Sequence, residues 1–496
     1  MKVAVIGSGQ AAISCAEGLI ERGIKPVVLD VGETLPADLQ ARADTLASSR
    51  PEAWAVGADD FPAPPQEGRL PKKTVFGSDY LYASDRPYAP LYRSATTAAP
   101  SFAKGGFSMG WGGAALPGHA DDLTAWPFDV RRLDTHYAKA LQTMPVAGAA
   151  DGLNEAFPLH QECACPMRPT AQGASLMDDL QHARDLLNRG HDRVLFGAAR
   201  LAVDSDRCAH CAMCLTGCPY GVIHTLDKAL DRLIAAGSVR YQPRAYVVSL
   251  EEQAGQVAVN WIDTRTNDKR SDTFERVFVG AGALSSTRLV LNSMKAYGQS
   301  VPVIDSAKFA IPMLRLSSPP FEWPATNTLA DLFIEAVLPE VSPYWLHAQI
   351  SPLNDMMLQA MHMRATGRGR ELNMLGKLAR PLTNRMMVAW CALHSDLSSE
   401  CTLSINRGPD DLPILNLGVG ADRSRAYVRA YGRKLARMGL KFSTLFATPA
   451  TLISPPGSTG HCGGSLPMRA HPQGPFESDV LGRPNGWRRI HLVDPS

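Results

Sequence analysis

The sequence predicts an α/β fold in two parts, one built on a parallel sheet and the other an α+β unit with a mixed sheet. A strand, a glycine turn, a helix and a second strand follow one another in KVAVIGSGQAAISCAEGLIERGIKPVVLD at the N-terminus. The order strand, glycines, helix returns in RVFVGAGALSSTRLVLNS, residues 276–293. From about residue 300 the chain shifts to longer stretches rich in Met, Pro and aromatic residues. The first two features are typical of a Rossmann-like domain, and the third indicates a second domain.

The elements of the N-terminal unit follow from its hydrophobic pattern. Residues 2–6, KVAVI, form an apolar, β-branched run that is typical of a buried parallel strand. Apolar residues recur at helical spacing over 11–22, Gly23 ends that helix, and IKPVVLD at 24–30 is the second strand. Residues 36–75 are rich in Pro, Ala and Asp and lose this periodicity, so we expect a surface excursion with one helix.

Loops, helices and paired strands are expected in the next stretch. Residues 100–118, SFAKGGFSMGWGGAALPGH, are so rich in glycine that they predict a loop lying against a ligand. TAWPFDVRRLDTHYAKALQTM predicts a turn and a helix, TLDKALDRLIAAG a helix, and YQPRAYVVSLEE with QVAVNWIDT a pair of strands. We therefore expect a first domain over 1–300 with a cysteine-rich insertion at about 160–222, a second over 301–445, and a return to the first over 446–496.

Composition excludes several classes of function. The chain has 496 residues, 45% of them hydrophobic and 20% charged, as expected of a globular protein of two to four domains. A net charge of +2 and the lack of a Lys/Arg run argue against a nucleic-acid partner. We find no apolar run long enough to span a membrane and no signal-peptide pattern. Ten clustered cysteines indicate redox or metal chemistry in a reducing compartment, so the cytoplasm is expected, with export alongside a partner left open.

The glycine turn near the N-terminus predicts a dinucleotide site. Gly7, Gly9 and Ala12 form the GxGxxA pattern between a strand and a helix. Gly7 permits the tight turn, Gly9 lets backbone N–H groups approach a pyrophosphate, and Ala12 lets the helix pack closely on the sheet. Asp30 ends the second strand, where its carboxylate can accept hydrogen bonds from a ribose. This pattern alone does not separate NAD from FAD.

Further segments resemble the glucose–methanol–choline (GMC) oxidoreductases, which are FAD enzymes that act on alcohols and sugars. The similar segments are GGFSMGWGG at 105–113, AWPFDVRRLDTHY, AYVVSL, VFVGAGALSSTRLVL, STGHCGGSLPM and IHLVDPS, in that order along the chain. The resemblance implies pyrophosphate and ribose contacts at Gly7, Gly9, Ala12 and Asp30, and a flavin ring and ribityl chain near Gly105, Gly106, Ser108 and Gly113. It also implies Val247 beside the adenine, Gly282 and Ala283 close to the dinucleotide, and Asp494 near the ribityl phosphate.

The same resemblance implies a catalytic base at His461, in STGHCGGSLPM. In the family this histidine takes the hydroxyl proton while hydride leaves the carbon for flavin N5, and imidazole titrates near the working pH. The family usually continues past VDxS to a second His or Asn, whereas this chain stops at 494–496. Truncation, another residue in that role, or impaired catalysis are the alternatives. Two further histidines, His471 and His491, lie in the tail, but nothing aligns them with that second residue. His347 and His394 could line the substrate cavity, although structural roles are favoured for both.

The stretch CAHCAMCLTGCP has the cysteine spacing of bacterial ferredoxins. Its four candidate ligands are Cys208, Cys211, Cys214 and Cys218, followed by proline. In two-cluster ferredoxins the fourth cysteine serves the other cluster, so Cys218 could complete this site, or Cys163 or Cys165 could replace it. Either a [4Fe-4S] or a three-iron [3Fe-4S] cluster is compatible with the motif. Zinc and a metal-free loop are the alternatives, although structural zinc sites usually pair two CxxC units across a longer spacer.

These observations favour an FAD-dependent dehydrogenase that oxidises a sugar or another alcohol to a carbonyl. A branch of the GMC family that carries an iron–sulfur cluster passes electrons to a cytochrome subunit, so the expected partners are a small alcohol and an electron-acceptor protein. An oxidase that returns electrons to oxygen is the second hypothesis. A flavin-binding or electron-transfer component without turnover is the third.

Overall fold

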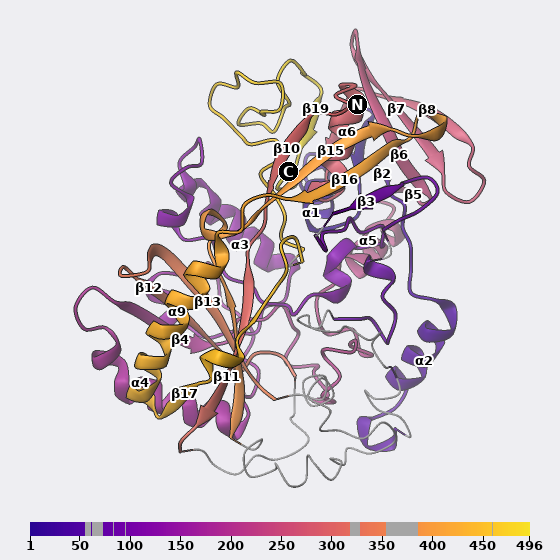
Figure 1. Cartoon of the computed structure of the whole chain (residues 1–496). Coiled ribbons are helices and arrows are strands. Elements are labelled where there is room, and N and C mark those ends of the chain that lie inside the picture. The colour runs from indigo at the N-terminus through magenta and orange to yellow at the C-terminus, as the bar shows by residue number, and fades with distance from the viewer. Residues whose placement is uncertain are drawn as a thin grey trace.

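Four sheets and the helices that pack on them form the computed structural model shown in Figure 1. It describes residues 1–54, 61, 73–82, 84–94, 96–317, 328–353, 385–458 and 460–496. The α/β fold class expected from the sequence is confirmed. No helix in these ranges is long and apolar enough to cross a membrane.

The first sheet is parallel and joins the two ends of the chain. Its order is β19-β9-β1-β2-β5, and every neighbouring pair runs parallel. Its strands are β1 Val3–Ile6, β2 Val27–Leu29, β5 Arg240–Gln242, β9 Arg276–Val279 and β19 Ile490–Leu492. The C-terminal tail therefore completes the sheet that the N-terminus begins, and both termini lie in this part of the molecule (Figure 1).

Alternating side chains of β1 bury two different layers. Val3 and Val5 pack against α1 (Gln10–Ile20) and α5 (Leu226–Ala235). Ala4 and Ile6 face α6 (Ala283–Ser293) and a second sheet. This second sheet consists of β6 Ala245–Gln253, β7 Gln256–Asp263 and β8 Lys269–Phe274, all antiparallel. The expected pairing of the two alternating segments is thus confirmed, and the N-terminal strand is buried on both faces, as its uniform apolarity predicts.

A large antiparallel sheet forms the second half of the molecule. Its path is β17-β11-β14-β13-β12-β4, and β18 also pairs with β11. The strands are β4 Arg193–Ala198, β11 Lys308–Arg315, β12 Leu332–Leu338, β13 Ser342–Pro352, β14 Met386–Ala392, β17 Thr444–Phe446 and β18 Leu452–Ile453. Helices α4 (Ala171–Leu187) and α9 (Ser424–Gly439) cover one face and form its core. The sheet takes β4 from before residue 300, and the boundaries at 300 and 445 stay a prediction.

A smaller mixed sheet bridges the two halves. It runs β10 Ser300–Ile304, β15 Glu400–Arg407, β16 Pro413–Val419 and β3 Leu91–Arg93, with β3 parallel to its neighbour. Its apolar residues pack on α6, so the chain of the second half returns to the first. Among the described residues of the excursion at 36–75, α2 (Ala37–Ala47) forms a helix, as expected, and α3 (Asp134–Thr143) follows the predicted turn.

Candidate active site

A cavity of about 1320 Å³ lies between the parallel-sheet half and the large antiparallel sheet. One end is lined by the turn after β1, the glycine-rich loop and the start of α6. The other end is lined by side chains of β11, β13 and β14 together with the tail loop that carries His461. A groove of this length and composition suits a large cofactor at one end and a small substrate at the other.

The turn after β1 is shaped for close approach of a ligand. Gly7 has φ +99°, and a Cβ there would lie 2.5 Å from the carbonyl oxygen of Gly280. Gly9 begins α1 and lines the cavity, so the helix N-terminus faces the space. Ala12 does not line the cavity: it is fully buried where Gly280 meets the helix, as expected of the packing residue of the motif. Backbone N–H groups and the helix dipole at this position favour an anionic group.

Asp30 lines the same end of the cavity and is held from two sides. Its Oδ2 accepts hydrogen bonds from the Ser8 hydroxyl at 2.6 Å and the Tyr241 hydroxyl at 3.2 Å. Burial raises the pKa of Asp30 to about 6, against the lowering effect of those hydrogen bonds. The carboxylate is therefore oriented and desolvated, which suits it to accept hydrogen bonds from ligand hydroxyls.

The glycine-rich loop divides into residues that face the cavity and residues that shape the loop. Gly106 and Ser108 line the cavity. Gly105 has φ +85°, and a Cβ there would lie 2.7 Å from the backbone nitrogen of Asp227. Gly113 also has a positive φ, +74°, and packs near Ala202 outside the cavity wall. Of the four predicted loop residues, two face the space and two serve the turn of the loop.

Residues from α6 and the C-terminal tail close the same end of the cavity. Val247, Gly282, Ala283 and Asp494 all line it, and their contacts with FAD stay a prediction. Oδ2 of Asp494 accepts hydrogen bonds from the Gly282 backbone at 2.8 Å and from the Ser286 hydroxyl at 2.5 Å. Burial raises the pKa of Asp494. The carboxylate thus ties the tail to the start of α6 beside the cavity.

Arg288, which the sequence reasoning missed, faces the cavity as a buried cation. It is only 2% exposed, and neither Nη1 nor Nη2 has a hydrogen-bond partner within the part of the chain that the structure describes. Its guanidinium lies 5.0 Å from the ring centroid of Tyr246 and 5.9 Å from that of Phe102. A buried charge without a partner is unfavourable, so this side chain indicates that an anionic ligand completes the site. It lies in the VFVGAGALSSTRLVL segment, where an arginine on an otherwise apolar helix face was the available signal.

The residues of this end fit FAD. The glycine turn and helix N-terminus suit a pyrophosphate, Asp30 suits a ribose, and Arg288 offers an unpaired positive charge. The cavity continues past Ser108 toward His461, which leaves room for a ring system at its centre.

The opposite end of the cavity holds two imidazoles and an ammonium. His461, His347 and Lys308 all line it, and they come from the tail loop, β13 and β11. The nearby positive charge of Lys308 lowers the pKa of His461 to about 3, and burial acts in the same direction. The side chain of His461 is exposed toward the cavity and surrounded by protein on its other sides. Because its pKa is lowered, its imidazole is neutral at physiological pH. Burial also lowers the pKa of Lys308 itself.

The other candidate histidines lie elsewhere. His394 stacks on Tyr344, with ring centroids 3.8 Å apart, and does not line the cavity. His491 stacks on Phe278 in the parallel sheet, and His471 is exposed in the tail. The structural role favoured for His394 agrees with its position, whereas His347 belongs to the cavity.

The four motif cysteines gather in a loop beside the cavity and are all free thiols. The backbone N–H groups of His210 and Met213 donate to the sulfurs of Cys208 and Cys211. His210 and Ala212 adopt positive φ angles of 51° and 59°, which turn the loop around its sulfurs. Burial raises the pKa of Cys208, Cys211 and Cys214, and mutual repulsion of the thiolates adds to that effect.

The donor set and the turns of this loop are compatible with an iron–sulfur cluster. Within the described ranges no group of three or more His, Cys, Asp or Glu side chains is arranged to hold a single metal ion. An iron–sulfur cluster spreads its thiolate ligands over several irons, and turns that aim N–H groups at sulfur are common at such sites. Cys163 lies near Arg200, and Cys165 is exposed. Whether Cys218, Cys163 or Cys165 would be the fourth ligand stays a prediction.

Lys73 and Trp111 lie between the cysteine loop and the cavity. Both line the cavity, and Lys73 Nζ donates to the Trp111 carbonyl at 2.9 Å. Burial lowers the pKa of Lys73 to about 8, while the sulfurs of Cys214 and Cys218 act to raise it. Trp111 packs against the same apolar cluster as three of the motif cysteines, Cys208, Cys214 and Cys218. The cysteine loop and the cavity thus share a wall, and that wall carries a buried positive charge.

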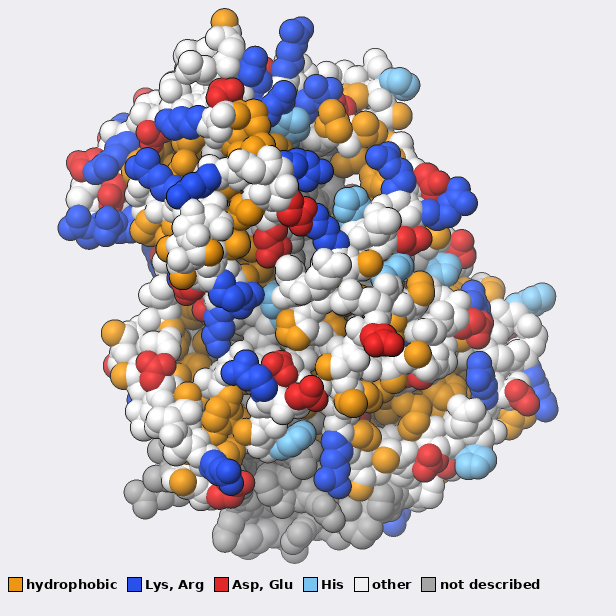
Figure 2. Space-filling model, turned by 180° about the vertical axis from the view of Figure 1, so that it is seen from behind, with side chains coloured by type: hydrophobic (Ala, Val, Ile, Leu, Met, Phe, Trp, Pro, Cys, Tyr) orange, Lys and Arg blue, Asp and Glu red, His pale blue; other side chains and the backbone are white. Residues whose placement is uncertain are grey.

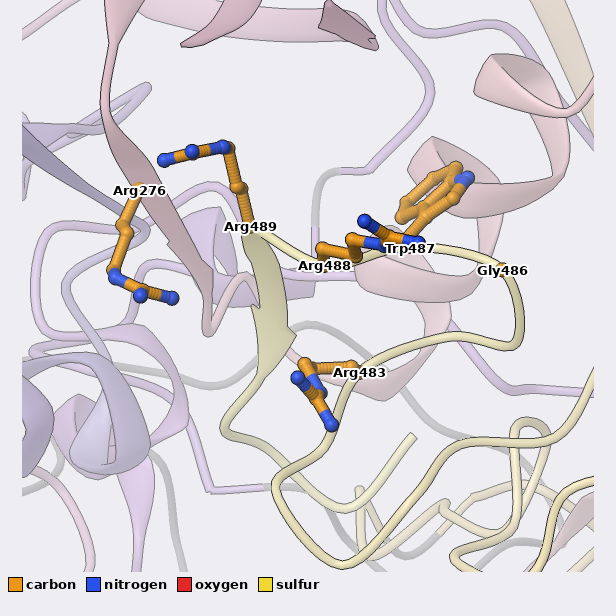
Figure 3. Close-up of a pocket in the computed structure, with 6 residues that line it drawn as sticks. All are labelled: Arg276, Arg483, Gly486, Trp487, Arg488 and Arg489. Atoms are coloured by element: carbon orange, nitrogen blue, oxygen red, sulfur yellow. The ribbon is translucent and has the colours of Figure 1, made fainter. Parts of the chain in front are cut away.

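A second cavity, of about 510 Å³, lies at the edge of the parallel sheet and contains no predicted site residue. Its lining includes Arg276, Arg483, Arg488 and Arg489, whose side chains point in different directions (Figure 3). Asp479 pairs with Arg483, and the carbonyl of Glu275 accepts from Arg489. Figure 2 shows acidic and basic side chains intermixed over the back of the molecule.

Comparisons with known proteins bear on the fold and on the cysteine loop. A family model described as a 4Fe-4S binding domain matches residues 201–223, which include the four motif cysteines. The chain is similar to pyridoxine 4-oxidase from Mesorbium loti, with a TM-score of 0.55 and 12% identity over 100% of this chain and 94% of that one. L-amino acid deaminase from Proteus vulgaris matches with a TM-score of 0.26 and 12% identity, over 62% of this chain and 53% of that one.

A flavoprotein/dehydrogenase from Cytophaga hutchinsonii matches with a TM-score of 0.26 and 10% identity, over 92% of this chain and 66% of that one. No curated protein matches the sequence. At 12% identity, the similarity to pyridoxine 4-oxidase establishes the fold and leaves the function to be argued from the site.

Proposed function

We propose that this protein is an FAD-dependent oxidoreductase of GMC type that oxidises an alcohol or sugar to a carbonyl. One observation carries the proposal: a single cavity joins a dinucleotide-type glycine turn and the unpaired Arg288 to a pair of imidazoles. The shared fold with an enzyme named pyridoxine 4-oxidase supports it, as does the sequence resemblance to the family. Bound FAD would supply a two-electron acceptor for hydride.

The residues of this chain would act in three ways. Gly7, Asp30 and Arg288 bind and orient the cofactor through its phosphates and ribose. The side chains of β11, β13 and β14 close the substrate end against bulk water. The neutral imidazole of His461 contacts the substrate hydroxyl and positions it for oxidation.

A cluster on Cys208, Cys211, Cys214 and Cys218 would serve as an electron exit to an external acceptor protein. The family match over 201–223 and the wall shared with the cavity favour this assignment over zinc or a metal-free loop. A cluster so placed supplies one-electron transfer and takes no part in breaking the C–H bond. The second candidate is an oxidase that passes electrons to oxygen, favoured by the name of the structural neighbour.

The test is anaerobic reduction of the purified protein by a panel of sugars, aliphatic alcohols and aromatic alcohols, including pyridoxine. We expect loss of flavin absorbance with at least one of them, and iron in the same sample. Fast peroxide formation in air would favour the oxidase. A protein that binds FAD but is bleached by no alcohol would support a component without turnover and contradict the proposal.

A further inference from the structure

A buried carboxylate holds one of the two cavity imidazoles in a fixed orientation. Glu335 on β12 and His347 on β13 face each other directly across the strand pair. Oε1 of Glu335 lies 2.5 Å from Nδ1 of His347, and Glu335 is only 2% exposed. The ring of Phe333 packs edge-on against the imidazole, with centroids 5.0 Å apart. Because Nδ1 is engaged by the carboxylate, Nε2 is the nitrogen that His347 can offer to a ligand in the cavity.

The surroundings of the two imidazoles are opposite in charge. His461 experiences the positive charge of Lys308, which opposes a second positive charge on its ring. His347 contacts the buried carboxylate of Glu335. A buried carboxylate is stabilised by a proton or by a cation beside it. His347 therefore has a carboxylate in direct contact that can serve as the counter-charge of an imidazolium.

Charged and titratable groups approach this pair from every neighbouring element. Burial raises the pKa of Glu335, whereas His347 and the more distant Arg200 act to lower it. The surrounding groups are Arg200 after β4, Asp122 in the loop before α3, Lys308 on β11, Cys391 on β14 and His461 in the tail loop. Glu335 is the only one of these described groups for which a hydrogen bond to His347 is found.

We propose that His347, oriented by Glu335, is the catalytic base of this cavity, and that His461 positions the hydroxyl. This inference rests on the proposed function. Bound FAD would accept the hydrogen of the C–H bond as a hydride, which carries both electrons of that bond. The O–H bond breaks and its proton passes to Nε2 of His347, so the carbon–oxygen bond becomes a carbonyl. Glu335 neutralises the imidazolium that results, in the way a buried carboxylate supports a catalytic histidine elsewhere.

Four variants test the assignment by anaerobic stopped-flow measurement of flavin bleaching at saturating alcohol, across a range of pH. His347→Gln should slow bleaching by about 100-fold or more and remove the acid limb of the pH profile. Glu335→Gln should slow it by about tenfold or more and move the acid limb to lower pH, because the imidazolium loses its counter-charge. His461→Gln should also slow bleaching but keep the acid limb. His394→Gln is the matched control, since this histidine also lies near a carboxylate, Asp396, but outside the cavity, and no change is expected.

A measurement on the unaltered protein guards against misfolded variants. Nitrogen-15 NMR of labelled histidines should find the proton of neutral His347 on Nδ1, and a proton on Nε2 would overturn the proposal. So would a His347→Gln variant that binds FAD and is bleached within about threefold of the wild-type rate with an unchanged acid limb. If the wild type is bleached while the His347→Gln variant behaves like it, the proposed function holds and only the role of His347 is wrong. Failure of every alcohol to bleach the wild type overturns the function as well as the inference.

Discussion

Replacing Arg288 with Leu should change apo stability and FAD affinity in opposite directions. In the apo protein the guanidinium is buried without a hydrogen-bond partner in the described chain, and two aromatic faces offset part of that unfavourable burial. Leu is shorter than Arg but removes the unpaired buried charge, so the free energy of unfolding of the apo protein should rise by about 1–3 kcal/mol.

The affinity for FAD should decrease in the Arg288→Leu variant. A hydrogen bond between the guanidinium and a phosphate is worth about 1.5–3 kcal/mol, so its loss should weaken FAD binding by about 10- to 150-fold. Flavin fluorescence titration of the apo protein measures the affinity, and urea unfolding with and without FAD measures the stability. Arg288→Lys should keep part of the affinity, because the charge remains but the paired geometry does not.

Arg407→Leu is the matched control for this experiment. Its guanidinium also lies over an aromatic ring, that of Tyr297 at 5.1 Å, but it is exposed and outside the cavity. We expect FAD affinity to stay unchanged in this variant. If Arg288→Leu binds FAD as tightly as the wild type, or destabilises the apo protein, then Arg288 does not complete an anion site and the reasoning is wrong.

Three further predictions follow from the same contacts. Asp30→Asn should remove a pH dependence of apo stability: because burial raises the pKa of Asp30 to about 6, the folded protein gains a proton as pH falls through that value. The wild-type free energy of unfolding should therefore fall by up to about 3 kcal/mol as the pH rises from about 4 to about 8. Urea unfolding should show a smaller difference in the variant. Cys214→Ser should lower the iron content and the broad absorbance beyond the flavin bands while FAD stays bound; full iron retention would exclude Cys214 as a ligand. Lys73→Gln should lower the reduction potential of the cluster by about 60 mV, or about 1.4 kcal/mol for one electron, in an EPR redox titration, and an unchanged potential would contradict its electrostatic role.

Local sequence pattern predicted the cofactor end of the cavity because that end depends on backbone conformation. Gly7 and Gly105 need positive φ angles and close approach, and such positions leave a trace in the sequence as glycine. The paired strands β6 and β7 were equally readable from alternation. The fourth ligand of the cysteine motif stays a prediction, because spacing along the sequence does not say which of Cys163, Cys165 and Cys218 folds toward the other three thiols.

The substrate end could not be read in this way. Glu335 and His347 lie on different strands, and the register that sets them opposite each other is a tertiary property. Lys308 comes near His461 because the tail loop folds back on β11, over 150 positions along the chain. Arg288 was missed because the sequence does not say that this face of α6 (Ala283–Ser293) lines the cavity. The local sequence pattern predicts none of these tertiary contacts.

The most direct test of the account follows electrons in a single anaerobic turnover. The protein is mixed with an alcohol that bleaches its flavin, and samples are frozen at intervals for EPR while absorbance is recorded. We predict that flavin absorbance falls first, with one carbonyl formed per flavin reduced, and that a change in the EPR signal of an iron–sulfur cluster follows. A flavin that is fully reduced while no cluster signal changes, in a sample that contains iron, would contradict the proposed exit beside Lys73 and Trp111.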